Sequence, residues 1–176
     1  ANRFFVHESV AAEFATKFAD AMAALSIGKG TVKGVEVGPL ITAKARAGVD
    51  ELVQDAIGKG ARALTGGAAL PGKGFFYAPT VLADVPASAR LLTEEIFGPV
   101  APVASFSDEA DAIARANDTE FGLVGYVFTK DLSRAIRVAE ALEFGMVGIN
   151  QGIVSNPAAP FGGVKQSGFG REGGFE

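Results

Sequence analysis

The chain has 176 residues, of which 48% are hydrophobic and 20% are charged, so it carries enough apolar material for a folded core and is not a disordered chain. A formal net charge of -4 repels phosphate polyanions and argues against a nucleic-acid partner. The chain has no cysteine and one histidine, His7, which excludes disulfides and a cysteine nucleophile within it, and we expect no metal site. No apolar run approaches the roughly 18 residues that span a bilayer, and the N-terminal segment lacks the layout of a signal peptide. We therefore expect a cytoplasmic protein without a membrane partner.

The first third of the chain predicts a strand followed by two helices. Residues 3–7 (RFFVH) have the composition of a strand, and Ser9 stands where it can cap the helix that follows. Thr42 stands where it can cap a second helix, which Gly58 and Gly60 end. Both helices have an apolar face at helical spacing. These faces consist of Val10, Phe14, Phe18 and Leu25 in the first helix and of Val49, Leu52, Val53, Ala56 and Ile57 in the second.

The rest of the chain continues the alternation of strands and helices. Extended segments are expected at residues 61–65, 75–77, 80–83, 100–106, 123–129 and 146–150. Helices are expected over residues 87–95, from an N-cap at Ser107 to residue 117, and from an N-cap at Asp131 to residue 142. Strands that alternate with helices predict βαβ units, so the expected fold class is α/β, with a mainly parallel sheet covered by helices. No linker divides residues 1–176, which are expected to form a single segment.

One segment matches a phosphate-binding pattern without its structural context. Residues 67–73 (GAALPGK) fit the pattern G-x-x-x-x-G-K, but Gly74 stands where a magnesium-binding Ser or Thr belongs. The residues that follow, FFYAPTV, have a strand composition, whereas phosphate binding requires a helix N-terminus. We therefore expect an ordinary surface loop.

Residues 94–99 (EEIFGP) place two carboxylates directly before an apolar turn. A carboxylate beside an aromatic ring can accept two hydrogen bonds from a vicinal diol while the ring packs on a flat heterocycle. That combination suits the ribose and ring of a nicotinamide nucleotide. In the alternative, Glu94 and Glu95 end a solvated helix and Phe97 belongs to the core. From the residues alone, both interpretations stay open.

Two features near the C-terminal end indicate a binding loop. Ser155 follows Ile153 and Val154 and precedes Asn156-Pro157, and its hydroxyl can donate to a substrate carboxylate or simply form a turn. Residues 160–172 (PFGGVKQSGFGRE) are rich in glycine and include Phe161, so they suit a loop whose backbone approaches a ligand closely. Without further information the segment predicts a pocket-forming loop and nothing sharper.

Several segments carry a family resemblance when they are taken in chain order. They are EEIFGP (residues 94–99), FTKDL (128–132) and PFGGVKQSGFGREG (160–173), supported by GPLI (38–41) and FYAPT (76–80). Together they resemble the aldehyde dehydrogenase superfamily, and the resemblance covers essentially the whole chain. Within it, GINQGIVS (148–155) followed by PFGG is most similar to succinate-semialdehyde dehydrogenases.

The resemblance implies a role for each of four residues. Glu95 would bind the nicotinamide ribose hydroxyls and Phe97 would pack against the nicotinamide side of NAD or NADP. Ser155 would hydrogen-bond the distal carboxylate of succinate semialdehyde, and Phe161 would line the substrate end of the tunnel. The implied substrate is a small-molecule semialdehyde, the implied pathway is 4-aminobutyrate degradation, and the implied assembly is a homo-oligomer, a dimer or tetramer.

The resemblance also implies that the chain is the C-terminal catalytic-domain portion of a larger enzyme. Residues 2–4 (NRF) resemble the segment just after the family's nucleophilic cysteine. The family's nucleophile, general base and dinucleotide-binding domain would then precede the chain, so no catalytic residue is expected within it. Two alternatives stay open: a dehydrogenase for another carboxylated semialdehyde, such as glutarate semialdehyde, and a non-catalytic binding or assembly module on the same scaffold.

Overall fold

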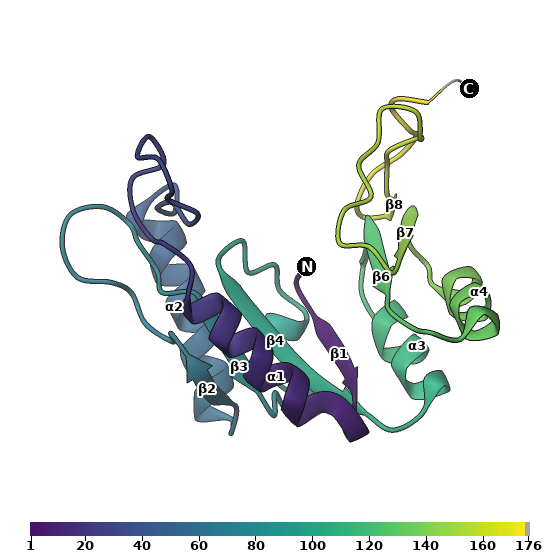
Figure 1. Ribbon diagram of the computed structural model, residues 1–176, viewed down its shortest axis with the longest axis horizontal. Coiled ribbons are helices and arrows are strands. Elements are labelled where there is room, and N and C mark those ends of the chain that lie inside the picture. The colour runs from purple at the N-terminus through teal and green to yellow at the C-terminus, as the bar shows by residue number, and fades with distance from the viewer. Residues whose placement is uncertain (175–176) are drawn as a thin grey trace. The chain divides into compact units, whose positions relative to one another are not determined.

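A computed structural model describes residues 1–174 (Figure 1). The chain divides between Ser107 and Asp108 into two compact units. No helix among the described residues is long and apolar enough to cross a membrane. The expectation of a single segment over residues 1–176 stays a prediction.

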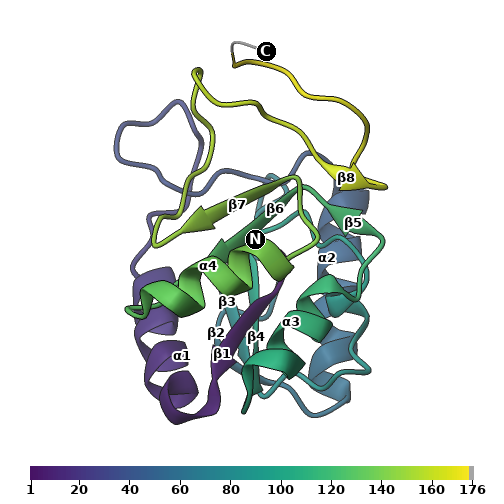
Figure 2. The same cartoon turned by 90° about the vertical axis from the view of Figure 1, so that its right-hand side faces the viewer.

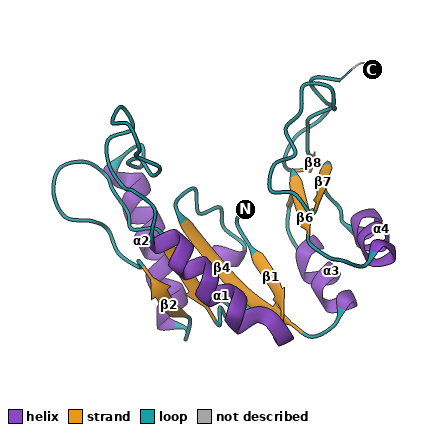
Figure 3. Ribbon diagram, in the orientation of Figure 1, coloured by secondary structure: helices purple, strands orange, loops and turns teal. Residues whose placement is uncertain are grey.

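The first unit is built on a four-stranded sheet in the order β1-β4-β3-β2. The strands are β1 (Phe4–His7), β2 (Arg62–Thr65), β3 (Thr80–Ala83) and β4 (Val100–Phe106). β1 and β3 both run parallel to β4, whereas β2 pairs antiparallel with β3 (Figure 3). The expected α/β class with a mainly parallel sheet is confirmed, and each of these strands falls within a segment that the sequence predicts to be extended.

The two faces of this sheet are buried under two different helices, because successive strand residues point to opposite faces. Helix α1 (Glu8–Ala23) packs its Ala15 and Ala19 against one face, where Val81 and Ala83 lie. Helix α2 (Ala43–Gly58) packs against the other face, where Leu82 and Val100 lie. The unit therefore has one apolar core on each side of a central sheet, and the short strand β3 is buried along its whole length.

Helix α2 follows the sequence prediction closely. The Thr42 hydroxyl accepts a hydrogen bond from the Ala45 backbone N–H at 3.0 Å, which caps the helix. Four of its five predicted core residues are buried, and Ile57 packs against the same cluster. The helix ends at Gly58, and Gly60 adopts a left-handed φ of 111°.

Helix α1 differs from its prediction in both its cap and its buried face. Its N-cap is His7, whose Nδ1 accepts a hydrogen bond from the Ser9 N–H, so the prediction of Ser9 as the cap is wrong. Val10 is 50% exposed and Phe14 is also exposed, whereas Phe18, the third predicted residue, packs against the core. The helix turns its alanines inward because a small side chain lets the helix backbone approach the sheet closely, and apolar size alone did not predict this.

The described part of the second unit, residues 108–174, contains two helices and two small sheets (Figure 2). Strands β6 (Val124–Val127) and β7 (Met146–Ile149) pair in parallel, and β5 (Phe121–Gly122) pairs antiparallel with β8 (Val164–Lys165). Helix α3 (Glu109–Asn117) is capped by Asp108, so the prediction of Ser107 as its cap is wrong. Helix α4 (Leu132–Ala141) is capped by Asp131 as predicted. A carboxylate oxygen caps both helices in the same way, by accepting from the N–H three residues later.

Candidate cofactor and substrate sites

The predicted cofactor residues Glu95 and Phe97 line one cavity of about 750 Å³ in the first unit. The cavity lies between the loop over residues 39–41, the first half of α2, and the segment that leads from the short 3-10 helix η1 (Arg90–Leu92) into β4. Its apolar lining residues are Pro39, Leu40, Ile41, Ala45, Val49, Leu52 and Ile96. Glu51, Arg90 and Glu94 supply the other charged groups.

The segment that carries Glu95 and Phe97 is pinned on both sides by buried side chains. Leu91 and Ile96 are buried in the core beside α2, whereas Glu95 is exposed. Phe97 is 81% exposed and has a φ of 50°, a left-handed conformation that is rare for an aromatic residue. The alternative that Phe97 belongs to the core is therefore wrong, and Phe97 is an exposed residue in the lining of the cavity.

The side chain of Asn2, near the N-terminus, forms hydrogen bonds to this same segment. Its Nδ2 donates to the carbonyl oxygens of Leu91 at 3.2 Å and Glu94 at 3.1 Å. Its Oδ1 accepts from the Ile96 N–H at 3.0 Å. Sequence reasoning missed Asn2, because its partners lie about 90 residues away and no local pattern joins them.

Glu94 and Glu95 are neighbours in sequence but differ in their partners. The Arg90 guanidinium donates to both oxygens of Glu94, at 2.7 and 3.0 Å. This hydrogen bonding lowers the pKa of Glu94 and raises the pKa of Arg90. Among residues 1–174 no hydrogen bond or ion pair is formed by the Glu95 carboxylate. Glu95 is therefore the carboxylate that is free to accept hydrogen bonds from a ligand in this cavity.

The predicted substrate residues Ser155 and Phe161 both lie in the second unit, on the chain that follows β7. Val154 packs over Gly148 of β7, where a β-carbon would come within 2.8 Å of the valine methyl. The next residue, Ser155, is exposed, and the Asn156 carboxamide oxygen accepts from the Ala158 N–H in a tight turn. Ser155 thus lies on the surface just beyond an anchored valine.

The glycine-rich segment after Ser155 closes on itself into a defined loop. The backbones of Phe161 and Glu172 exchange two hydrogen bonds, at 2.7 and 2.8 Å, which join the ends of the loop. Inside it, the Arg171 guanidinium donates to the carbonyl oxygens of Gly163 and Gly170. Phe161 is half-buried at the base of this loop. The segment is a loop, as expected, whereas its role in forming a pocket stays a prediction. Phe161 is held by backbone hydrogen bonds on both sides of its α-carbon.

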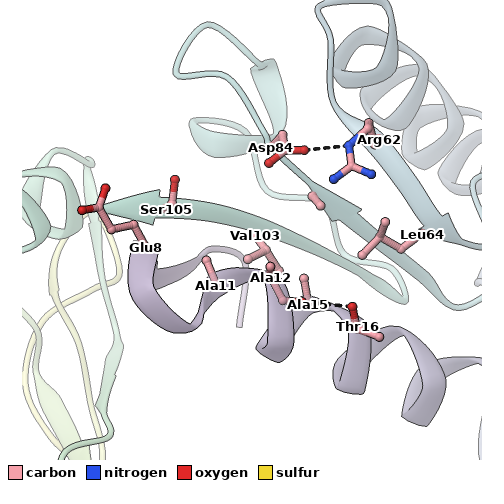
Figure 4. Close-up of a pocket in the computed structure, with 11 residues that line it drawn as sticks. Glu8, Ala11, Ala12, Ala15, Thr16, Arg62, Leu64, Asp84, Val103 and Ser105 are labelled. Carbon is pink, nitrogen blue, oxygen red and sulfur yellow. Dashed lines mark hydrogen bonds and ion pairs between the residues drawn. The ribbon is translucent and has the colours of Figure 1, made fainter. Parts of the chain in front are cut away.

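A second cavity, of about 330 Å³, lies between α1 and the sheet of the first unit (Figure 4). Its floor is mostly small side chains, and its main polar feature is the ion pair of Arg62 and Asp84, with Nε and Oδ2 2.7 Å apart. Both side chains are about two-thirds exposed, so this is a surface ion pair in which the two charges neutralise each other. None of the four predicted site residues lines this cavity.

The remaining candidate motifs have structural roles. Residues 67–73 form a loop, and the next regular element is strand β3 rather than a helix, so the segment lacks the helix N-terminus that a phosphate-binding loop requires. No cluster of potential metal ligands is present among residues 1–174. His7 caps α1 and packs edge-on against Phe106, with 5.4 Å between the ring centroids.

Comparison with known proteins gives consistent matches over the whole chain. The family model described as "Aldehyde dehydrogenase family" matches residues 1–176. A succinate-semialdehyde dehydrogenase of Paenarthrobacter nicotinovorans is 61% identical over 176 residues, which are 100% of this chain and 39% of that protein. A succinate-semialdehyde dehydrogenase [NADP(+)] of Escherichia coli is 56% identical, over 98% of this chain and 36% of that protein. A glutarate-semialdehyde dehydrogenase of Pseudomonas putida is 54% identical, with the same two coverages.

Solved structures agree with these relatives. A crystal structure of an Escherichia coli NADP-dependent enzyme superposes with a TM-score of 0.96 at 56% identity, over 99% of this chain and 36% of that one. A succinate-semialdehyde dehydrogenase from Burkholderia pseudomallei superposes with a TM-score of 0.96 at 51% identity, over 98% of this chain and 36% of that one. The chain spans well under half the length of the relatives that it matches. On its sequence and its fold together, the chain belongs to the aldehyde dehydrogenase family.

Proposed function

We propose that the protein containing this chain is an NAD(P)+-dependent succinate-semialdehyde dehydrogenase, which oxidises succinate semialdehyde to succinate. One observation carries the proposal in this chain: the unpaired Glu95 carboxylate and the outward-turned Phe97 ring line the same cavity. Relatives at 61% and 56% identity that are named succinate-semialdehyde dehydrogenases support the substrate.

The carboxylate and the aromatic ring that line the cavity fit the nicotinamide end of NAD or NADP. A free carboxylate accepts two hydrogen bonds from the vicinal hydroxyls of a ribose, and an exposed aromatic ring offers a flat apolar surface to the nicotinamide. Glu94 does not compete for this role because Arg90 occupies both of its oxygens. When bound, the oxidised nicotinamide accepts the hydride that leaves the substrate.

The nucleophile of the proposed reaction lies outside this chain, which contains no cysteine. In the family mechanism a cysteine thiolate attacks the aldehyde to form a thiohemiacetal, and a thioester is hydrolysed after the oxidation step. The residues of this chain bind and orient the reactants. Orientation matters to the rate, because a misplacement of about 1 Å can cost on the order of a hundredfold.

Ser155 and Phe161 are proposed to define the substrate end of the site. The exposed Ser155 hydroxyl is free to donate to the distal carboxylate of the semialdehyde, and the anchored Val154 beside it limits how far the segment moves. Phe161 is proposed to supply an apolar wall, since its backbone is held by Glu172 on both sides of its α-carbon.

Glutarate semialdehyde is the second candidate substrate. It differs from succinate semialdehyde by one methylene, and two relatives named glutarate-semialdehyde dehydrogenases are 54% and 53% identical to this chain. One methylene in an apolar pocket changes the free energy of binding by only about 1–3 kcal/mol. Discrimination between the two substrates therefore depends on the distance from Ser155, which is proposed to bind the carboxylate, to the position of the reacting aldehyde carbon.

As part of the same proposal, the complete protein acts in the cytoplasm as a homo-oligomer, a dimer or tetramer, on a small-molecule substrate. Leu132 and Ile136 lie one turn apart on α4 and are both exposed, so they form a contiguous apolar surface that an assembly would cover.

The substrate assignment is tested in the complete protein with Ser155→Ala. We expect a drop of about tenfold in kcat/KM for succinate semialdehyde and no change for an uncharged aldehyde of similar length, because one hydrogen bond to a charged group contributes about 1.5–3 kcal/mol. Ser133→Ala, on the exposed surface of α4, is the matched control and leaves both values unchanged. Equal effects of Ser155→Ala on the charged and the uncharged aldehyde would contradict the assignment.

A further inference from the structure

We propose that Asn2 is a positioning residue for Glu95: its carboxamide sets the direction of the Glu95 side chain and so the binding of the nicotinamide ribose. The inference rests on the proposed function of Glu95 and adds a residue that contacts neither cofactor nor substrate. Its basis is the pattern of three hydrogen bonds between the Asn2 side chain and the segment over residues 91–96.

Two of these three hydrogen bonds are made to the peptide groups on either side of Glu95. The carbonyl of Glu94 belongs to the peptide group that precedes Glu95, and the N–H of Ile96 belongs to the peptide group that follows it. Asn2 binds the first through Nδ2 at 3.1 Å and the second through Oδ1 at 3.0 Å. Fixing both peptide planes fixes φ and ψ of Glu95, and these angles determine where its Cα–Cβ bond points.

Asn2 directs both of its donors and its acceptor oxygen to this segment. Both Nδ2 hydrogens are engaged, by Leu91 and by Glu94, and Oδ1 is engaged by Ile96. Only an amide side chain carries two donors and an acceptor in one plane. An aspartate of the same shape keeps the acceptor but loses both donors and brings a negative charge against two carbonyl oxygens. The arrangement is therefore specific to the carboxamide rather than to the volume of the side chain.

The segment needs such an external hold because its own conformation is unfavourable. Phe97 has a φ of 50°, and a non-glycine residue in this region persists only where the surroundings enforce it. Gly98 presses on α2, since a β-carbon there would lie 2.8 Å from Val49 Cγ2. The packing of Gly98 holds the segment after Glu95, and Asn2 holds the peptide groups on each side of it.

A second asparagine in the chain makes the same kind of contact within the other unit and supplies a matched control. Asn117 donates through Nδ2 to the Ala141 carbonyl at 2.9 Å and accepts through Oδ1 from the Glu143 N–H at 2.9 Å. It joins the ends of α3 and α4 within the second unit. Loss of this clamp is expected to affect stability alone.

The test compares Asn2→Ala, Asn2→Asp, Glu95→Ala, the double variant Asn2→Ala/Glu95→Ala and Asn117→Ala in the complete protein. The readouts are the dissociation constant of the reduced nucleotide, measured by nicotinamide fluorescence, and the thermal midpoint. Nucleotide binding does not involve the nucleophile, so it reports on the cofactor site separately from the chemical step, and Glu95→Ala gives the share that depends on Glu95. We expect Asn2→Ala and Asn2→Asp to weaken binding by about tenfold, as a misdirected carboxylate would, whereas Asn117→Ala lowers the midpoint and leaves binding within about twofold.

The double variant decides between positioning and general stability. If Asn2 acts through Glu95, its loss adds less than about twofold once Glu95 is already alanine, because coupled residues are not additive. Equal effects of Asn2→Ala in the two backgrounds, or equal effects of Asn2→Ala and Asn117→Ala on binding, would overturn the inference. An unmodified protein that binds no nicotinamide nucleotide would instead overturn the proposed function. If Glu95→Ala weakens binding and neither Asn2 variant does, only the role of Asn2 is lost.

Discussion

The two units of the chain are each stabilised by a different kind of internal contact. In the first unit, apolar side chains from α1, α2 and the sheet form two cores. In the second unit, Ala135 is the only buried hydrophobic residue among those that the structure describes. The other buried positions of that unit, among residues 108–174, are glycines: Gly122, Gly125, Gly148 and Gly163. The first unit thus packs side chain against side chain, whereas in the second unit side chains and backbone pack against the backbone of glycines.

Gly145 illustrates the backbone packing of the second unit. A β-carbon there would overlap the Gly162 carbonyl oxygen and lie 2.8 Å from Gly163 Cα. The chain just before β7 therefore lies directly against the loop that carries Phe161. Side chain to backbone hydrogen bonds add to this contact: the Ser167 hydroxyl accepts from the Gly122 N–H, and Lys165 donates to the carbonyl oxygens of Asn117 and Thr119.

This difference matters for the two halves of the proposed site. Glu95 and Phe97 are carried by a segment anchored in a side-chain core, where the removal of volume is costly. Ser155 and Phe161 are carried by a loop anchored through glycines, where the addition of volume is costly. Removal of core volume is therefore expected to disturb Glu95 and Phe97, whereas addition of volume at the glycines is expected to disturb Ser155 and Phe161.

The largest effect is expected from the removal of volume in the first unit. Leu82 in β3 is completely buried, and Leu82→Ala should lower the free energy of unfolding by about 3–4 kcal/mol. Leu132 on α4 is 75% exposed, so the same change there should cost less than about 0.5 kcal/mol. Urea denaturation of the 176-residue chain, with hydrogen exchange to assign the loss to β3 or α4, measures both. Comparable losses for the two variants would contradict the difference in packing between the units.

The next effect is expected from the addition of volume in the second unit. Gly145→Ala should lower the free energy of unfolding by about 2–3 kcal/mol, because the Gly162–Gly163 backbone must move to admit one methyl group. Gly152 is the matched control, because a β-carbon added there would have open space within 4 Å. Hydrogen exchange should show the loss in β7 and in the Phe161 loop for Gly145→Ala and no change for Gly152→Ala. A neutral Gly145→Ala would mean that the loop does not depend on this contact.

The sequence predicts best where the signal is local and periodic. The Thr42 cap, the buried face of α2 and the limits of β4 all follow from spacing within one element. The buried face of α1 does not follow from spacing, because Val10 and Phe14 match the helical period and yet remain exposed. There the close approach of helix and sheet selects alanine over larger apolar residues, and that choice depends on a partner surface that periodicity does not describe.

The candidate site shows the same limit. Without the family resemblance, Glu94 and Glu95 were equivalent in sequence, although Arg90 stands four residues before Glu94 at the spacing of an ion pair on a helix. That signal was available and would have identified Glu95 as the free carboxylate. The contacts of Asn2 carry no such signal, since they join residues about 90 positions apart.

The smallest effect concerns one polar contact in the core between the sheet and α2 of the first unit. The Tyr77 ring is buried, and its hydroxyl donates to Asp50 Oδ1 at 3.0 Å. Burial, reinforced by the Asp50 carboxylate, raises the pKa of Tyr77 well above its ordinary value. Tyr77→Phe should therefore cost about 1 kcal/mol at pH 7, the usual net contribution of one hydrogen bond.

The pH dependence gives this prediction a sign. Because the pKa of Tyr77 is higher in the folded than in the unfolded chain, its contribution is complete below about pH 10 and declines as the pH rises further, when the unfolded tyrosine ionises first. The unmodified chain should then lose stability above about pH 10 more steeply than Tyr77→Phe, so the gap between them narrows. Urea denaturation between about pH 7 and pH 11 measures both slopes. Tyr126, the other tyrosine, lies in the second unit and is 36% exposed, so Tyr126→Phe at pH 7 is the control for loss of a hydroxyl outside the cores and should cost less than about 0.5 kcal/mol. A gap that stays constant with pH for Tyr77→Phe would contradict the prediction.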